Sequence, residues 1–391
     1  MLKCLTACTI LLAAVPAVAQ LTVPQDAKSR EALRRAGAEV LFWNQAQRDR
    51  NFCQMERVFP TLTVRAGTPR LLPRGRTLPI QSVKVDRFIA GQNIAGLIVL
   101  QDGRVRLERY ARSFSPAKRW TSFSVAKSLT STLIGAAVKD GSIRSLDDQV
   151  VRYVPELKGT AYDGVSVRQV LTMSSGVKWN EDYTDPKSDV AQMFARPVPA
   201  GEDVTVAYLK KLPRAAAPGS TWNYNTAETN LAGVILGRAV KMPISRYASL
   251  RVWRPMGMEA DAAWQVDEHG HEIAGCCLSA RLRDYGRLGQ LMLDDGRTPA
   301  GQRILPTGWV KEATSMHHSF PGGRAGYGYF WWTSPRGYRA SGIFGQSIWV
   351  DPQRRVVIAA LSAYPRAVDE SLSRERQAFF TQLAIAASPS R

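Results

Sequence analysis

Histidine is scarce in this sequence, and the scarcity narrows the ways in which a catalytic nucleophile could be activated. Only four histidines occur among 391 residues, His269 and His271 in one segment and His317 and His318 in another. Neither segment follows a strand-to-helix pattern, and no G-x-S-x-G sequence is present to place a serine near a histidine base. A Ser-His-Asp triad is therefore not expected.

Patterns typical of metal sites are also missing. The run of acidic residues and histidines at 267–272 lacks H-E-x-x-H spacing, and the cysteines lack the paired spacing of a zinc site. We expect this run to form an exposed polar loop. We also expect the protein to need neither a metal nor another cofactor.

Long apolar runs are absent, because no stretch reaches the ~18 residues that would suggest a transmembrane helix. At the N-terminus, Lys3 precedes a short apolar run at 9–15 and small residues at 17–19. This order predicts a signal peptide over residues 1–19 and a periplasmic or secreted protein. Lipoprotein processing at Cys8 is the weaker interpretation, since the apolar run follows that cysteine.

The sequence has only five cysteines, and the predicted signal peptide contains two of them. The remaining three are Cys53, Cys276 and Cys277. In an oxidising compartment, one disulfide is expected between Cys53 and either Cys276 or Cys277, because adjacent cysteines rarely bond to each other. Three free thiols are the alternative.

Acidic residues are outnumbered, 33 against 52 basic residues, which gives a formal net charge of +19. Such a charge could favour anionic surfaces or acidic substrates. The basic residues are scattered, however, and no nucleic-acid-binding motif accompanies them. We expect a small-molecule substrate and no nucleic-acid partner.

Hydrophobic periodicity predicts helices and strands in a recognisable order. A strand at 94–100, a turn at 102–103 and a returning strand at 105–110 form a hairpin. The other predicted elements are helices at 29–49, 166–171, 226–239, 244–253, 279–293 and 368–387, and strands at 327–332, 346–350 and 356–361.

This order predicts an α/β (α+β) fold, in which helices flank an antiparallel sheet and an all-helical domain is inserted between the sheet halves. The expected divisions are a signal peptide at 1–19, an N-terminal helix and linker at 20–80, a sheet domain at 81–145 and 270–387, a helical domain at 146–269, and a tail at 388–391.

A further helix is predicted to begin near residue 124. Apolar residues recur there at helical spacing, Thr121 or Ser122 could cap its start, and Gly141 suits its end. Ser124 and Lys127 are three residues apart and would share one helix face. In the first turn, unpaired N–H groups and the helix dipole would favour the negative charge of a serine alkoxide or an oxyanion.

A serine nucleophile needs a partner to take its proton, and lysine or tyrosine can replace histidine in this role. A buried lysine loses its proton more easily than an exposed one. Tyr224 is the tyrosine candidate, because it follows a Pro-Gly turn and comes immediately before the helix predicted at 226–239.

Together these motifs resemble the serine beta-lactamase and penicillin-binding-protein superfamily, whose S-x-x-K motif matches residues 124–127. The class C-like branch is most similar, above all its 6-aminohexanoate-dimer (nylon-oligomer) hydrolases and family VIII-type carboxylesterases. The similarity runs from about residue 60 to 385 and includes segments at 140–143, 171–176, 181–183, 224–226, 327–332, 342–346 and 348–352.

The resemblance implies that Ser124 forms an acyl-enzyme while Lys127 and Tyr224 move its proton. Tyr224 would then protonate the leaving group and later activate water. The backbone N–H groups of Ser124 and Gln346 would form the oxyanion hole.

Four residues would contact the substrate: Tyr183, Asn225, Ile343 and Gly345. In the nylon-oligomer branch the tyrosine matching Tyr183 contacts the substrate. The sequence departs from the superfamily at Ile343, where Lys or His is usual, and at Thr226, where class C beta-lactamases have asparagine.

These features predict an exported serine hydrolase for small ester or amide substrates. A beta-lactamase or low-molecular-weight penicillin-binding protein (DD-peptidase) is a rival interpretation, which Ile343 disfavours. A non-catalytic binding scaffold is another, which the presence of Ser124, Lys127 and Tyr224 disfavours.

Overall fold

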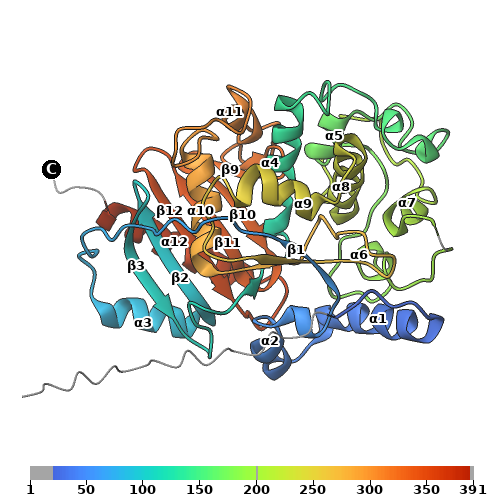
Figure 1. The fold of residues 1–391 in the computed structure, drawn as a ribbon. Coiled ribbons are helices and arrows are strands. Elements are labelled where there is room, and N and C mark those ends of the chain that lie inside the picture. The colour runs from blue at the N-terminus through green and yellow to red at the C-terminus, as the bar shows by residue number, and fades with distance from the viewer. Residues whose placement is uncertain (1–20, 200, 388–391) are drawn as a thin grey trace, which may run out of the picture.

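Eight strands form the central sheet, and every neighbouring pair is antiparallel (Figure 1). The computed structural model describes residues 21–199 and 201–387, so the predicted signal peptide and tail lie outside the described residues. The strand order is β3-β2-β12-β11-β10-β9-β8-β7. The bounds are β2 Ile94–Gln101, β3 Arg104–Tyr110, β7 His318–Ser319, β8 Gly326–Tyr327, β9 Trp332–Ser334, β10 Gly337–Gly342, β11 Gln346–Asp351 and β12 Val356–Ser362.

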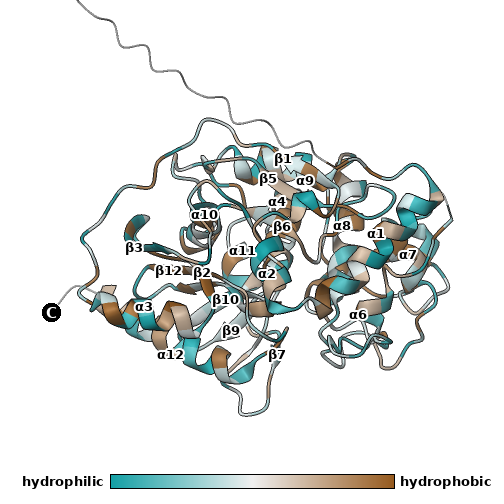
Figure 2. Cartoon of the chain, turned by 90° about the horizontal axis from the view of Figure 1, so that it is seen from below, coloured by the Kyte–Doolittle hydropathy of each residue, from teal (hydrophilic) through white to brown (hydrophobic). Residues whose placement is uncertain are grey.

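Helices cover both faces of this sheet, which explains why β2 is apolar along almost its whole length. Leu97 and Val99 belong to the apolar cluster beneath α3 (Ser82–Gly91) and α12 (Glu370–Ala387). On the other face, Ile98 and Leu100 approach α10 (Leu282–Leu293). Figure 2 shows α3 and α12 lying together along the sheet. The predicted fold class is confirmed.

A second, smaller sheet was not predicted. It has the order β1-β5-β6-β4, with β1 Thr61–Val64, β4 Trp120–Thr121, β5 Ala262–Gln265 and β6 Leu278–Ala280. These strands have two to four residues each, which is too short for a hydrophobic alternation to be recognised in sequence. The small sheet matters because β4 leads directly into the predicted nucleophile.

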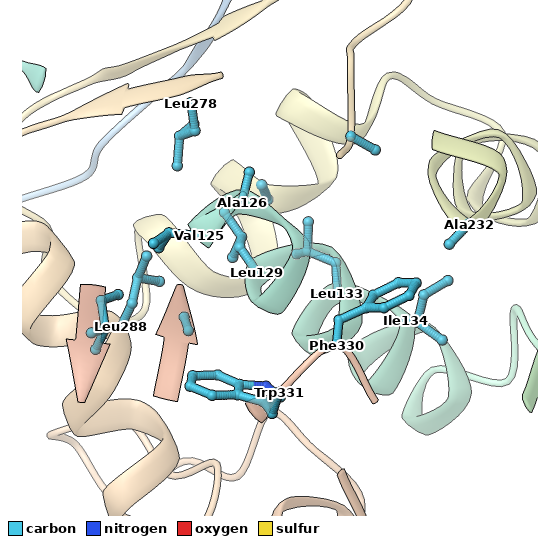
Figure 3. Close-up of a cluster of buried hydrophobic side chains, with 14 of the residues drawn as sticks. Val125, Ala126, Leu129, Leu133, Ile134, Ala232, Leu278, Leu288, Phe330 and Trp331 are labelled. Atoms are coloured by element: carbon cyan, nitrogen blue, oxygen red, sulfur yellow. The ribbon is translucent and has the colours of Figure 1, made fainter. Parts of the chain in front are cut away.

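Helix α4 (Val125–Lys139) runs through the middle of the molecule and is buried on all sides up to Ala137. Figure 3 shows its apolar side chains between Ala232 of α8, Leu288 of α10 and the turn at Phe330. Gly141, at φ 75°, follows its end as predicted.

Short helices make up the region beside the sheet, and α8 is the longest of them. The α-helices are α5 Val167–Leu171, α6 Asp189–Gln192, α7 Val204–Leu209, α8 Thr226–Val240, α9 Ile244–Ala248 and, near the sheet, α11 Trp309–Ala313. The 3₁₀ turns are Met55–Arg57, Val150–Arg152, Pro155–Leu157 and Ile343–Gly345. The helix predicted at 244–253 continues beyond α9 as a π-helical turn, Ser249–Trp253.

Three predicted elements were wrong in detail. The helix at 279–293 begins only at Leu282, because Ser279 and Ala280 belong to β6. The helix at 29–49 is divided into α1 (Ala27–Glu39), a 3₁₀ turn (Val40–Phe42) and α2 (Gln45–Asn51), because Asn44 forms a capping box with Gln47 and starts a new helix. The strand at 327–332 is broken by a turn, because Phe330 has φ 58°.

The run at 267–272 is not the exposed loop that we expected. Asp267 is buried and accepts hydrogen bonds from the backbone N–H groups of His269 and His271. Glu268 is also buried and forms an ion pair with Arg34 of α1. Across residues 21–199 and 201–387, no group of three or more His, Cys, Asp and Glu side chains could hold a metal ion. In the same ranges, no helix is long and apolar enough to cross a membrane.

Candidate active site

Ser124 lies at the end of a sharp turn that leads into α4. The preceding residue, Phe123, has φ 41°, in the left-handed region that residues other than glycine rarely adopt. Contrary to the prediction, neither Thr121 nor Ser122 caps the helix. The Ser122 hydroxyl instead donates to the carbonyl of Phe123 and accepts from the N–H of Leu278 at 3.0 Å. The turn is therefore fixed to β6 rather than to the helix.

Lys127 is fully buried and contacts the nucleophile candidate directly. Its Nζ lies 3.0 Å from Ser124 Oγ, 3.0 Å from Thr226 Oγ1 and 2.8 Å from the carbonyl oxygen of Gly275. Burial lowers the pKa of Lys127 to about 8, and the charge of Glu181 acts in the opposite direction. A larger share of this amine is therefore neutral, and able to accept a proton, than of an ordinary lysine.

Tyr224 lies beside Lys127, inside an aromatic cluster. Its ring stacks on Trp332, with centroids 5.6 Å apart, and meets Tyr327 edge to face at 6.1 Å. Lys127 Nζ lies 5.3 Å from the centroid of the Tyr224 ring. The aromatic segment around residues 327–332 therefore holds Tyr224 in place, a role that the sequence did not reveal.

The charge state of Tyr224 differs from that of Lys127. Burial and then the charge of Glu181 raise the pKa of Tyr224, and a hydrogen bond with Ser124 acts in the opposite direction. Tyr224 is thus a neutral phenol at physiological pH. It can donate a proton to a leaving group, while Lys127 is the better proton acceptor.

Glu181 is a site residue whose role the sequence did not indicate. One carboxylate oxygen accepts from Tyr183 Oη at 2.7 Å and from the hydroxyl of Thr226. The other accepts from the backbone N–H of Thr226 at 2.9 Å and from the indole N–H of Trp179. The contact joins residues 45 positions apart, so no local pattern could have revealed it.

The two predicted oxyanion donors approach each other across Gly342. In the β10–β11 pairing, Gly342 lies opposite Gln346. A Cβ atom on Gly342 would lie 3.0 Å from the Ser124 backbone nitrogen and 2.7 Å from the Ser122 carbonyl oxygen. Only glycine leaves enough room here, although its φ of −129° suits any residue.

The side-chain amide of Gln346 makes hydrogen bonds to neighbouring strands through both its oxygen and its nitrogen. Its carbonyl oxygen accepts from the Trp120 indole at 3.1 Å and from the N–H of Ser362 at 3.0 Å. Its amide nitrogen donates to the carbonyls of Ser362, Phe344 and Ile343. These bonds connect the first residue of β11 to β4 and β12, so the Gln346 backbone is rigidly placed.

A mostly apolar cavity opens in front of Ser124 and encloses about 1100 Å³, counting the space at its mouth. Two of the residues predicted to contact the substrate, Tyr183 and Ile343, line it. Helix α1 supplies an unexpected wall. Further lining residues are Leu33, Arg34, Gly37, Ala38, Val40, Leu41, Met55, Phe59, Phe123, Val190, Ala191, Met193, Phe194, Val204, Thr226, Gln265, Val266, Asp267, Glu268, Ile273, Cys276 and Cys277.

The other two residues predicted to contact the substrate, Asn225 and Gly345, also have structural roles. Asn225 is buried and caps α8, where its Oδ1 accepts from the N–H of Glu228 at 3.1 Å. Gly345 is buried at φ 92°, and a Cβ atom there would meet the ring of Tyr364 at 2.5 Å. Neither residue lines the cavity.

The predicted disulfide from Cys53 to Cys276 or Cys277 was wrong. Cys276 and Cys277 are bonded to each other, and Cys53 is a free thiol that donates to the carbonyl of Arg50. Cys277 has φ 72°, in the left-handed region that residues other than glycine rarely adopt. The bonded pair lines the cavity together with Ser124.

Comparison with known proteins found a matching family and similar hydrolases. The sequence model of the family described as Beta-lactamase matches residues 84–382. A 6-aminohexanoate-dimer hydrolase from Paenarthrobacter ureafaciens is 31% identical over 351 residues, which covers 83% of this chain and 87% of that protein.

Solved structures share the fold. A protein from Bacillus anthracis, provisionally assigned as a 6-aminohexanoate-dimer hydrolase, superposes with a TM-score of 0.77 at 21% identity, over 88% of this chain and 95% of that one. A family VIII carboxylesterase superposes with a TM-score of 0.59 at 15% identity, over 80% and 98% of the two chains.

Proposed function

The chain belongs to the beta-lactamase family, and we propose that it is a serine hydrolase that cleaves small ester or amide substrates through an acyl-enzyme on Ser124. One observation carries the proposal: Lys127 Nζ lies 3.0 Å from Ser124 Oγ, while its other two partners, Thr226 and Gly275, are placed to accept its protons.

Acylation begins when Ser124 Oγ attacks the substrate carbonyl carbon and its proton moves to Lys127. The carbonyl electron pair becomes an oxyanion, which the backbone N–H groups of Ser124 and Gln346 stabilise. Preorganised donors of this kind are each worth ~10²–10³ in rate.

The tetrahedral intermediate then collapses, and the bond to the leaving group breaks. Tyr224 donates a proton to the departing oxygen or nitrogen and regains one from Lys127. In deacylation, water attacks the acyl carbon, its proton passes to the same pair, and Ser124 leaves with a proton. Carboxylic acid and free enzyme are the products, and no cofactor takes part.

The cavity supports uncharged substrates with an apolar acyl or leaving group. Most of its lining side chains are aliphatic, aromatic or part of the disulfide, and Ile343 offers no cation for a carboxylate. The charged lining residues are Arg34, Asp267 and Glu268, and Arg34 is already paired with Glu268. The relatives include a 6-aminohexanoate-dimer hydrolase and a family VIII carboxylesterase, which supports amides and esters of this kind. A beta-lactamase or DD-peptidase, the rival assignment, would have to bind a carboxylate without that cation.

We also infer that the enzyme acts outside the cytoplasm, in the periplasm or as a secreted protein. The order of charge, apolar run and small residues at the N-terminus supports this location. Edman sequencing of the protein purified from the culture medium or the periplasm would test it, with Gln20 expected at the N-terminus.

A p-nitrophenyl ester series from acetate to octanoate tests the activity, with Ser124→Ala as the comparison. Turnover by the wild type that is abolished in Ser124→Ala supports the assignment. Equal rates in both proteins would exclude Ser124 as the nucleophile. Faster turnover of nitrocefin than of any ester would favour the beta-lactamase alternative.

A further inference from the structure

Glu181 has four hydrogen-bond partners, and all of them donate. They are the hydroxyls of Tyr183 and Thr226, the backbone N–H of Thr226 and the indole N–H of Trp179. Both carboxylate oxygens therefore act only as acceptors, which is the role of an ionised carboxylate. All four hydrogen bonds of Glu181 are made to groups of the protein itself, so we expect Glu181 to act through these neighbours.

The first consequence falls on the Thr226 hydroxyl. A hydroxyl has one proton and two lone pairs, and Thr226 gives its proton to Glu181. Toward Lys127 Nζ, 3.0 Å away, this oxygen can only accept. Glu181 thus decides the direction of a hydrogen bond in which it takes no part.

The second consequence falls on Lys127. A neutral amine has two N–H groups and one lone pair. The carbonyl of Gly275 and the hydroxyl of Thr226 both accept, so they take the two N–H groups. The lone pair is left for the third neighbour, the hydroxyl of Ser124. This is the orientation that a general base requires.

We propose that Glu181 is a positioning residue, which makes Thr226 a hydrogen-bond acceptor and thereby directs the lone pair of Lys127 at Ser124. The proposal rests on the proposed function of Ser124 and Lys127. If the Thr226 hydroxyl donated to Lys127, the lone pair of the amine would accept that hydrogen bond, and an N–H of Lys127 would face Ser124 instead. The nucleophile would then face a donor instead of a base.

The same geometry explains why threonine can stand at position 226. An asparagine side chain carries a carbonyl oxygen, which accepts from lysine without help. A threonine hydroxyl can be a donor or an acceptor, so its direction has to be set by another group. In this chain Glu181 sets the direction of the Thr226 hydroxyl by accepting its proton. The backbone N–H of Thr226 also donates to Glu181 and holds the carboxylate next to that hydroxyl.

Glu181→Gln is the direct test, with Asp182→Asn as the matched control. An NH₂ group in the place of the oxygen that faces Trp179 and the Thr226 backbone would meet two N–H groups that cannot accept. The new NH₂ group should therefore face the hydroxyls of Tyr183 and Thr226, which can accept, so the Thr226 proton is displaced toward Lys127. Asp182 is exposed, and its carboxylate accepts from the backbone N–H and the hydroxyl of Thr184 within its own turn. Asp182→Asn therefore removes the same charge without touching the four hydrogen bonds of Glu181.

We expect Glu181→Gln to lower kcat/KM for p-nitrophenyl esters by ~10- to 100-fold, less than the ~10²–10⁴-fold of general-base catalysis itself. The acid limb of the pH profile should move to lower pH, because the charge of Glu181 raises the pKa of Lys127. Mere damage to the site would lower the rate without that movement. A Glu181→Gln profile that coincides with that of the wild type would overturn the proposal.

Thr226→Asn supplies an independent test through a double-mutant cycle. Because asparagine carries its own acceptor, Glu181→Gln should cost clearly less in the Thr226→Asn background than in the wild type. Equal costs in both backgrounds would refute the role of Glu181 in orienting residue 226. An active Ser124→Ala variant would instead defeat the proposed function, so the two failures can be told apart.

Discussion

The rings of Phe123 and Phe344 pack against each other with their centroids 5.3 Å apart, and both residues have a left-handed backbone, at φ 41° and 57°. Phe123 immediately precedes Ser124, and Phe344 lies two residues before Gln346. One aromatic contact therefore joins the turn before the nucleophile to the turn before the second oxyanion donor. Phe52 completes the contact at 5.0 Å and 5.4 Å from the two rings.

Phe344→Ala should loosen this contact and separate the two oxyanion donors. We expect a loss of ~3–5 kcal/mol in the free energy of unfolding, as for other buried phenylalanines. We expect kcat to fall by at least ~10-fold, since losing one oxyanion donor outright costs ~10²–10³. Phe380→Ala is the control, because Phe380 is equally buried on the far face of the sheet. Equal effects of both variants on kcat below their melting temperatures would contradict this coupling.

The acylation rate should depend on pH through Lys127. Its pKa is lowered by burial to about 8, and only the neutral amine can accept the Ser124 proton. We therefore expect kcat/KM to rise with pH and to reach half its maximum near pH 8. Stopped-flow acylation rates, with the rate of Ser124→Ala subtracted, would measure this limb. A profile that does not change across this pH would exclude Lys127 as the base.

Gly37 of α1 lines the cavity, and a Cβ atom added there would meet no atom within 4 Å. Gly37→Leu should therefore fill part of the cavity without disturbing its walls. We expect kcat/KM for the octanoate ester to fall by ~10-fold relative to acetate, as a few buried methylenes are worth that much. Gly91→Leu is the control, since Gly91 has similarly open surroundings in α3. An unchanged chain-length preference would show that α1 does not bound the acyl group.

The bonded pair Cys276–Cys277 can be detected chemically and tested for its effect on activity. Trypsin should release residues 252–281 as one peptide containing both cysteines, two hydrogens lighter than the reduced form and resistant to alkylation. Reduction with a phosphine should lower the esterase rate, because Gly275, which accepts from Lys127, adjoins Cys276.

Cys53→Ser serves as the control for that experiment. It removes the free thiol and should leave both the peptide mass and the sensitivity to reduction unchanged. Alkylation of both cysteines without any reductant would contradict the bond.

The local sequence pattern predicted that Ser124 and Lys127 lie side by side, and they do. Residues three positions apart share one helix face, whatever the rest of the fold is. Strands β11 and β12 were also predicted, since residues 348–350 and 356–361 are short apolar runs. The role of Glu181 could not be predicted, because its contact with Thr226 exists only after two distant loops meet.

The predicted disulfide and the predicted helix cap were wrong, because both rested on how often such residues have these roles in other proteins. Adjacent cysteines rarely bond, yet Cys276 and Cys277 are bonded here. The backbone of Cys277 is left-handed, a conformation that the local sequence did not indicate. Ser122 is a favourable capping residue, but its hydroxyl is used to hold Leu278 of the small sheet. That sheet has strands too short to be anticipated, so the competing partner was not foreseen.

The pairing of β2 with β12 governs when activity can arise during synthesis. Residues 94–101 of β2 lie beside residues 356–362 of β12, and β11, with its oxyanion donor, is the next strand. While the chain is being made, β2 can pair with β3, but its other neighbour, β12, lies more than 250 residues away. A nascent chain can already contain Ser124 and Lys127 and still have no oxyanion hole. Hydrolysis should therefore begin only after the last strands have been released and folded, and no N-terminal fragment should carry it.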